Sequence, residues 1–507
     1  MTASPLPTID KTRWDYLPAE VRLLILECLL QDGCSLARLA TVSREWQGVM
    51  EQHNFARIKL TPSRLGDLNH MTSGKRSLVH YLWFCFELEK YDCNGCASVD
   101  NDTWEIGGSD ITLILKAIEN LFSALSVWKP SGDLVLDIGV HSPSDSEHWF
   151  KYLTFGPDVP LDERSRSRCI EQAQVDDVRH EWLRGRRIIA PEKYAICRVT
   201  STVMGDEEFF ESQEEETQWW QQLPLIPAVT GFLLRQQNHR QWAPIALKHM
   251  FTHFPGLKEI HYEPWREWTK YLQFDTDKAY QLLFESLTSY NIRKLVIFEN
   301  FNEYYLSSLK FHDCDRIRIP NPNISRVIAS ASLGLEELSA SFIVDASYFL
   351  NACQTSWLWP NLTSIVLTSR LLTPLKSRAS INSMLVAAAA AAENMPKLKT
   401  MEIWNGRKGL AMLFSYQSGS GCGRNPAVVT CRGTWELVLH STVTRAWEAV
   451  AVKHRYVGPV FVKELLGDAT AVKSHGDAIH HLKLSGSVIR PVSLQQIQME
   501  HQVMEGV

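Results

Sequence analysis

The most informative motif in the sequence is Trp359-Pro360-Asn361-Leu362-Thr363-Ser364-Ile365-Val366-Leu367, because it recurs along the chain and so indicates the fold. After an apolar residue and a proline, apolar residues occupy positions 362, 365 and 367. The same motif occurs at residues 254–262 and 395–403, and versions without the proline occur at 292–297 and 335–340. Because side chains alternate along a strand, the last two apolar residues of each copy share one face of a short strand, and the first anchors the entering turn.

Five copies of one motif predict a repeat array. In such an array each unit adds a strand and a returning helix and buries its apolar face against its neighbours. The pattern resembles the core of a leucine-rich repeat. The copies recur 35, 43, 27 and 36 residues apart, which is longer and more uneven than the usual spacing of about 20 to 29 residues. We therefore predict a degenerate leucine-rich-repeat-like region over residues 226–430, with helical returns such as 280–287 and the alanine run 384–392.

The flanking segments also predict mixed α/β structure. Residues 78–88 are almost wholly apolar, which indicates a strand covered on both faces, and a helix over 111–128 and a strand over 134–138 follow. We assign residues 61–140 to the start of the repeat-like domain. Residues 431–507 are predicted to form a C-terminal α/β cap, with a strand at 435–439, a helix at 443–453 and an apolar segment at 461–466.

Residues 14–50 predict three short helices with more apolar surface than they can bury. Pro18 suits the first position of a helix, and apolar residues then recur at three- and four-residue steps through Leu29. Gly33 suits a helix end, and Ser35 can cap a second helical segment. A unit of about 40 residues has too little interior for all these side chains. The segment therefore predicts a surface for another protein.

The same residues resemble the F-box family, over residues 13–60. The resemblance rests on Leu17-Pro18-x-Glu20, on Ile25, Leu29 and Leu36, on Val42-Ser43-Arg44-x-Trp46, and on the strand-like residues 58–60; Phe55 departs from the tryptophan that many members carry there. It implies docking onto a Skp-type adaptor that bridges to a cullin scaffold. The contacts that it implies are Leu17, Pro18, Ile25, Leu29, Leu36, Val42 and Trp46. The alternative is an amphipathic helical hairpin packed on the rest of the chain.

Three C-terminal sequence segments are similar to the C-terminus of a group of fungal F-box proteins that bear a conserved domain of unknown function. They are MPKLKTMEIWNGRKG, TWELVLHSTVTRAWEAV and KSHGDAIHHLKLSGSVIRPVSLQQI. Together the resemblances imply a substrate-recognition subunit of an SCF-type ubiquitin ligase, whose C-terminal region receives a protein substrate. The alternative is a non-catalytic scaffold protein with an F-box but no ligase role.

Composition restricts the partners and the compartment. A net charge of -5 provides no general positive field, so nucleic acid is not expected as a partner. The N-terminus lacks the pattern of a secretory signal, and the apolar stretch 111–128 contains charged residues, so we expect no membrane association. Eleven scattered cysteines indicate reduced thiols, hence a cytoplasmic or nuclear protein. Residues 1–12 are expected to be disordered.

Residues 141–225 carry segregated charge, with arginine clusters followed by an acidic run at 206–216. Such a segment is typical of a solvated insertion or mobile loop. The alternative is a docking segment for a charged partner.

No group of residues predicts catalysis, a cofactor or a metal. Cys93 and Cys96 form one C-x-x-C pair, but no second pair or neighbouring histidine cluster completes four ligands, so we predict two thiols in a turn, with structural zinc as the alternative. His475, Asp477, His480 and His481 form a compact set with spacing unlike that of helical metal ligands. An enzyme with a cryptic C-terminal site would have to use this set.

Overall fold

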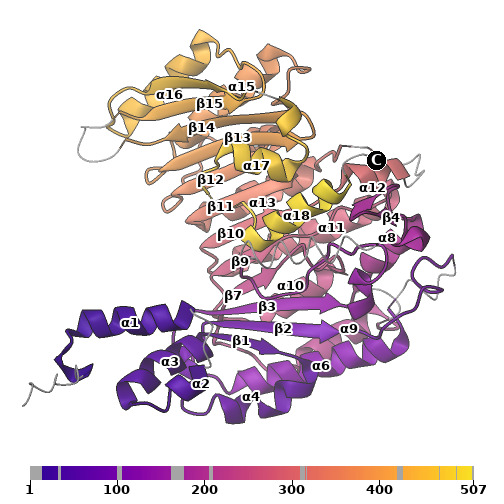
Figure 1. The fold of residues 1–507 in the computed structure, drawn as a ribbon. Helices are drawn as coiled ribbons and strands as arrows, with labels where there is room; N and C mark the ends of the chain where they lie inside the picture. Colours follow the sequence, from indigo (N-terminus) through magenta and orange to yellow (C-terminus); the bar gives the residue numbers. More distant parts are fainter. Residues whose placement is uncertain are drawn as a thin grey trace, which may run out of the picture.

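Twelve strands of the described residues form one sheet. Each of them lies beside the strand that precedes it in the sheet's order along the chain (Figure 1). The structure is a computed structural model that describes residues 14–31, 36–99, 106–160, 176–204, 209–308, 315, 317–419, 426–467, 469–486 and 488–504. The strands are β1 (Arg57–Leu60), β2 (Tyr81–Glu87), β3 (Leu134–His141), β7 (Val229–Leu234), β9 (Glu259–Tyr262), β10 (Lys294–Phe298), β11 (Glu337–Asp345), β12 (Ser364–Thr368), β13 (Thr400–Arg407), β14 (Leu410–Gln417), β15 (Val428–Gly433) and β16 (Val460–Leu465).

The sheet is parallel from β1 to β13 and changes direction only at its far end. There β14 is antiparallel to both β13 and β15, and β16 returns parallel to β15. A mixed α/β fold, predicted from the sequence, is confirmed in this form.

The recurring sequence motif explains how neighbouring strands align in the sheet. Its residues align across neighbouring strands, so that one row of paired residues comprises Ile260, Leu295, Leu338, Ile365 and Met401. The residues two positions later form a second row, of Tyr262, Ile297, Ala340, Leu367 and Ile403. Both rows are buried in one hydrophobic core, so the predicted strand face is confirmed.

The first row continues through four more strands that the sequence analysis did not recognise as copies. Phe232 pairs with Ile260, Leu136 with Phe232, Leu82 with Leu136, and Ile58 with Leu82. Long segments separate these strands in the chain, and the pairing of β3 with β7 has a register shift between Leu134 and Val135. Spacing alone therefore hides the first half of the array.

Among the residues that the structure describes, nine helices line one face of the sheet, here called the helical face, and share its hydrophobic core. They are α4 (Leu65–Met71), α6 (Gly108–Ser126), α9 (Gln213–Gln222), α10 (Pro244–Thr252), α11 (Lys270–Ser286), α13 (Pro322–Ala331), α14 (Ala346–Ala352), α15 (Arg378–Ala392) and α16 (Ser441–Lys453). The predicted helices at 111–128, 280–287, 384–392 and 443–453 fall within α6, α11, α15 and α16 apart from their ends.

The strand predicted at residues 435–439 is wrong. These residues connect β15 to α16 without strand structure, because β15 already pairs with β14 on one side and β16 on the other. The alternating Trp435, Leu437 and Leu439 pack against the core of the helical face.

The C-terminal segment folds back across the opposite face of the sheet, where α17 (His475–Leu482) and α18 (Pro491–Val503) lie over the strands (Figure 1). Ile479 and Leu482 share a hydrophobic cluster with Trp404 of β13. A Cβ atom at Gly406 would lie 2.4 Å from the Cβ of Ala478, so glycine is required where α17 crosses β13. The predicted cap, residues 431–507, thus includes two helices that return to the middle of the sheet.

Residues 141–225 contain more folded structure than their charge pattern indicates. Trp149, Tyr152 and Trp182 are buried in a separate hydrophobic cluster with residues of α8 (Lys193–Val199). Two small strand pairs lie nearby in the chain, β4 (Trp182–Leu183) with β5 (Arg186–Arg187) and β6 (Thr202–Val203) with β8 (Gln241–Trp242). Residues 161–175 and 205–208 lie outside the described residues, with the charged positions that they contain.

Candidate functional site

The N-terminal helices expose apolar side chains. They comprise α1 (Ala19–Gln31), α2 (Leu36–Leu39) and α3 (Arg44–Ala56), and α3 runs directly into β1. Leu26 is buried, whereas five other apolar side chains are between 37% and 60% exposed. We call these five the N-terminal apolar surface: Val21, Leu23, Leu24, Ile25 and Val42. In Figure 1, α1 extends from the first edge of the sheet, away from the rest of the protein.

Polar contacts fix the arrangement of these helices. The Ser43 hydroxyl accepts a hydrogen bond from the Trp46 amide at 3.3 Å and caps α3. Glu45 accepts one bond from the Trp14 indole at 2.8 Å and one from Arg22 at 2.9 Å. The Trp14 bond and the Arg22 guanidinium lower the pKa of Glu45. The bridge from Arg22 to Glu45 joins α1 to α3.

The predicted adaptor contacts differ in exposure. Pro18, Ile25 and Val42 are exposed, and Leu17 and Leu29 are half-buried. Trp46 is half-buried with its ring centroid 5.1 Å from that of Trp14. The side chain of Leu36 lies outside the described residues. Exposed apolar residues that were not among the predicted contacts are Val21, Leu23 and Leu24. The sequence signal that could have identified them is the excess of apolar residues on the first helix.

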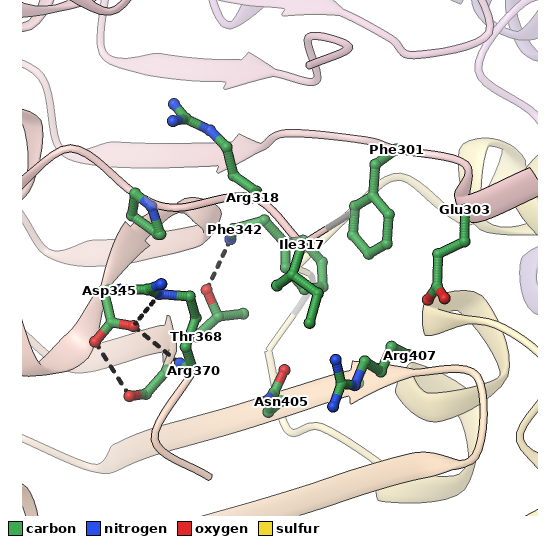
Figure 2. A pocket seen from close by; sticks show the side chains of 13 residues that line it. Phe301, Glu303, Ile317, Arg318, Phe342, Asp345, Thr368, Arg370, Asn405 and Arg407 are labelled. Carbon is green, nitrogen blue, oxygen red and sulfur yellow. Dashed lines mark hydrogen bonds and ion pairs between the residues drawn. The ribbon is translucent and has the colours of Figure 1, made fainter. Parts of the chain in front are cut away.

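A pocket lies where β10, β11, β12 and β13 end (Figure 2). The carboxyl ends of parallel strands meet at one edge of a sheet, which is where open α/β sheets bind ligands. Phe342 has a left-handed backbone conformation with φ of 66°, at the register shift in β11. This bulge directs β11 toward the pocket. The lining residues are Phe301, Glu303, Ile317, Arg318, Pro320, Phe342, Asp345, Thr368, Ser369, Arg370, Asn405, Gly406 and Arg407.

Ion pairs and hydrogen bonds engage several of the charged groups in this pocket. Arg318 pairs with Glu299 at 2.7 Å and with Asp277 at 2.6 Å. Asp345 accepts from the Arg370 amide at 2.9 Å and the Ser369 hydroxyl at 3.1 Å, as Figure 2 shows. Burial raises the pKa of Glu299, and Arg318 opposes that rise.

Arg407 is the cation that this arrangement leaves for a ligand. It lines both this pocket and a neighbouring hollow that contains Leu375 and Lys376, and it makes no ion pair with any of the described residues. An apolar wall of Phe301, Ile317 and Phe342 stands beside it. The pocket thus combines this apolar wall with the Arg407 guanidinium and the Glu303 carboxylate.

The C-terminal histidine set does not form a shared site. His475 is buried, and its Nε2 atom lies 2.9 Å from Asn300 Oδ1. Asp477 accepts from the Lys473 amide at 3.1 Å, at the start of α17, and His480 is exposed. Burial lowers the pKa of His475. Within the described part of the chain, these residues form no cluster that could hold a metal.

One comparison with known proteins finds a match. A model described as "Family of unknown function (DUF6546)" matches residues 287–490, less than half of the chain. No curated protein and no solved structure matches. The matched range contains β10 to β16, α17 and every lining residue of the pocket. It does not include the N-terminal helices.

Proposed function

We propose that this protein is the substrate-recognition subunit of an SCF-type ubiquitin ligase, acting in the cytoplasm or nucleus. The N-terminal helices bind a Skp-type adaptor, and the repeat-bearing remainder binds a protein substrate. The observation that carries the proposal is the N-terminal apolar surface, whose side chains the described part of the chain leaves exposed. Such surfaces on folded proteins commonly mark interaction sites. The aligned rows of apolar residues support a leucine-rich-repeat-like array for the remainder.

The exposed side chains provide much of the free energy that a stable complex needs. Full burial of such a side chain contributes about 1.5 to 3 kcal/mol. The five residues are each about half exposed, so their burial would contribute about 4 to 7 kcal/mol together. A micromolar complex corresponds to about 8 kcal/mol, and association itself has an entropic cost. Pro18 and the half-buried Leu17 and Leu29 would supply additional contact area.

The role of the subunit in ubiquitin transfer is to hold the substrate near the charged ubiquitin-conjugating enzyme. Tethering raises the effective concentration of the reacting groups, so no side-chain chemistry is required of the subunit. The pocket at the ends of β10 to β13 is the proposed substrate contact, because it combines an apolar wall with Arg407.

Adaptor binding tests the proposal directly. In a pull-down with purified adaptor, the Leu24→Glu/Ile25→Glu double variant should lose binding, as should Leu17→Ala/Pro18→Ala. Val452→Glu, at an exposed position of α16, is the matched control and should retain binding. Because Leu24 and Ile25 are exposed, the unfolding temperature of the double variant should not fall. Adaptor binding by both double variants would refute the proposed docking surface.

A reconstituted ubiquitination assay separates the ligase role from the scaffold alternative. A ligase subunit should cause loss of a captured partner that depends on the cullin, whereas a scaffold should bind the adaptor without such loss. Proximity labelling with wild-type protein and with Arg407→Glu should identify partners whose capture depends on the pocket.

A further inference from the structure

The chain brings the C-x-x-C pair together with two histidines from distant segments. Cys93 Sγ lies 3.5 Å from His148 Nδ1, and Cys96 Sγ lies 3.5 Å from His180 Nε2. The potential ligand atoms of Cys93, His148 and His180 all lie within 4.8 Å of one another. Sequence analysis did not find the histidines because they lie 52 and 84 residues beyond Cys96.

We propose that Cys93, Cys96, His148 and His180 form a structural zinc site. Zinc binds thiolate sulfur at about 2.3 Å and imidazole nitrogen at about 2.0 to 2.1 Å in a tetrahedron, so a sulfur and a nitrogen on one ion lie about 3.5 Å apart. Both cysteine-to-histidine distances have this value. Cys93, His148 and His180 supply three clustered ligands. Cys96, whose sulfur lies 3.5 Å from His180 Nε2 but outside that group of three, is the fourth and would move toward the others on binding. Four protein ligands are typical of structural sites and leave no position for a reacting water.

Groups around the cluster hold each histidine in the orientation that ligation requires. His180 Nδ1 lies 2.7 Å from Asp177 Oδ2, and His148 Nε2 lies 3.3 Å from the Tyr91 carbonyl oxygen. If these nitrogens carry the protons, the lone pairs of His180 Nε2 and His148 Nδ1 face the cysteine sulfurs. Metal-ligating histidines almost always donate their other N–H to a carboxylate or a carbonyl in this way.

The turn that carries the cysteines is also fixed by its neighbours. Asp92 Oδ1 accepts from the amides of Asn94 at 2.9 Å and Gly95 at 3.1 Å. Arg198 donates to the Gly95 carbonyl at 3.1 Å, and Arg179 donates to the Cys93 carbonyl at 3.2 Å. These bonds hold the cysteine turn against α8 and against the segment of His180.

Burial and charge favour zinc over an uncoordinated cluster. Cys96, His148 and His180 are buried, and Cys96 belongs to the hydrophobic cluster of Trp149 and Trp182. Zinc binding would release one proton from each thiol, and two thiolates with two neutral imidazoles balance the charge of the ion. The ion would add a direct link among three chain segments that hydrogen bonds and a small hydrophobic cluster already hold together.

Metal analysis of the untagged, full-length protein tests the site. We expect one zinc per chain after dialysis, and cobalt substitution should give the visible bands of a tetrahedral ion with thiolate ligands. Cys93→Ser/Cys96→Ser, His148→Gln and His180→Gln should each lose the zinc. Asp177→Asn should keep the ligands but bind zinc about 10- to 100-fold more weakly.

Cys85 and His141 provide a matched control within the same chain. Cys85 Sγ lies 3.3 Å from His141 Nδ1, but among the described residues no third cysteine, histidine or carboxylate completes a ligand group around this pair. Cys85→Ser should therefore retain one zinc per chain. If a ligand variant fails to fold, the cobalt spectrum of the wild-type protein still decides. Wild-type protein that binds neither metal stoichiometrically, or a cobalt spectrum without thiolate bands, would overturn the proposal and leave two thiol–imidazole hydrogen bonds.

Discussion

Replacement of Glu500 by glutamine should remove a pH dependence from the docking of α18. Glu500 is fully buried and accepts hydrogen bonds from Tyr305 and, at 2.9 Å, from Tyr152. Burial raises the pKa of Glu500 from its ordinary 4.5 to about 7. Glutamine has the same shape and keeps an oxygen that can accept from both tyrosines, but it has no proton to lose.

The sign of the effect follows from proton linkage. Between pH 4.5 and 7 the docked helix keeps a proton that the undocked helix releases, so docking is strongest below pH 4.5 and weakens as the pH rises to 7. A pKa shift of one unit corresponds to about 1.4 kcal/mol. From pH 5 to pH 8 the wild type should lose about 2 to 3 kcal/mol of docking free energy that Glu500→Gln keeps.

Hydrogen–deuterium exchange of peptides from α18 measures this difference. After correction for intrinsic exchange, protection of the wild-type helix should fall about 30- to 100-fold more than that of Glu500→Gln between pH 5 and pH 8. Glu263, whose pKa burial also raises to about 7, contributes the same background to both proteins. Glu448→Gln, on the exposed side of α16, is the matched control. Equal pH dependence in wild type and Glu500→Gln would refute the assigned protonation.

Three further substitutions test other parts of the fold. Arg235→Met should lower the free energy of unfolding by about 3 to 5 kcal/mol in urea denaturation, because it leaves the buried Asp137 carboxyl without the guanidinium 2.8 Å away. Gly406→Ala should lower it by about 1 to 3 kcal/mol and increase exchange in α17, since the new methyl group would overlap Ala478, whereas Gly334→Ala, in open space, should not. Leu338→Ala, in the middle of the first row, should lower it by about 2 to 5 kcal/mol, and an unchanged urea midpoint would contradict the row as a core element.

The sequence revealed those parts of the fold in which one local pattern is repeated. Leu295 and Leu338 were each predicted to lie on the apolar face of a short strand, because each stands three residues after another apolar residue, and they pair laterally in the sheet. Units separated by long connections, such as those of Leu82 and Leu136, were missed because the distance between copies carries no information once insertions are long.

The return of α18 could not be predicted, for a different reason. Its buried side includes Ser493, Gln496, Glu500 and His501, so hydrophobic periodicity does not mark the face that packs on the protein. Their partners are Glu263, Thr154 and Tyr305 among others, hundreds of residues earlier in the chain. The cluster of Cys93 and Cys96 with two histidines was missed for the same reason, because only the folded chain brings the four together.

The C-terminal return also restricts where a partner can bind. Repeat arrays commonly bind partners on the exposed face of their strands, and tryptophans on such a face would be strong anchors. Here α17 and α18 cover that face over the middle strands, and Trp404 and Trp265 are fully buried. The strand-end edge with Arg407 and the apolar wall beside it lies outside the area that these two helices cover. Under the proposed function, a substrate would bind across the ends of β10 to β13, on the same sheet whose first strand continues directly from α3. Adaptor and substrate would then be held at a fixed separation, as proximity-driven transfer requires.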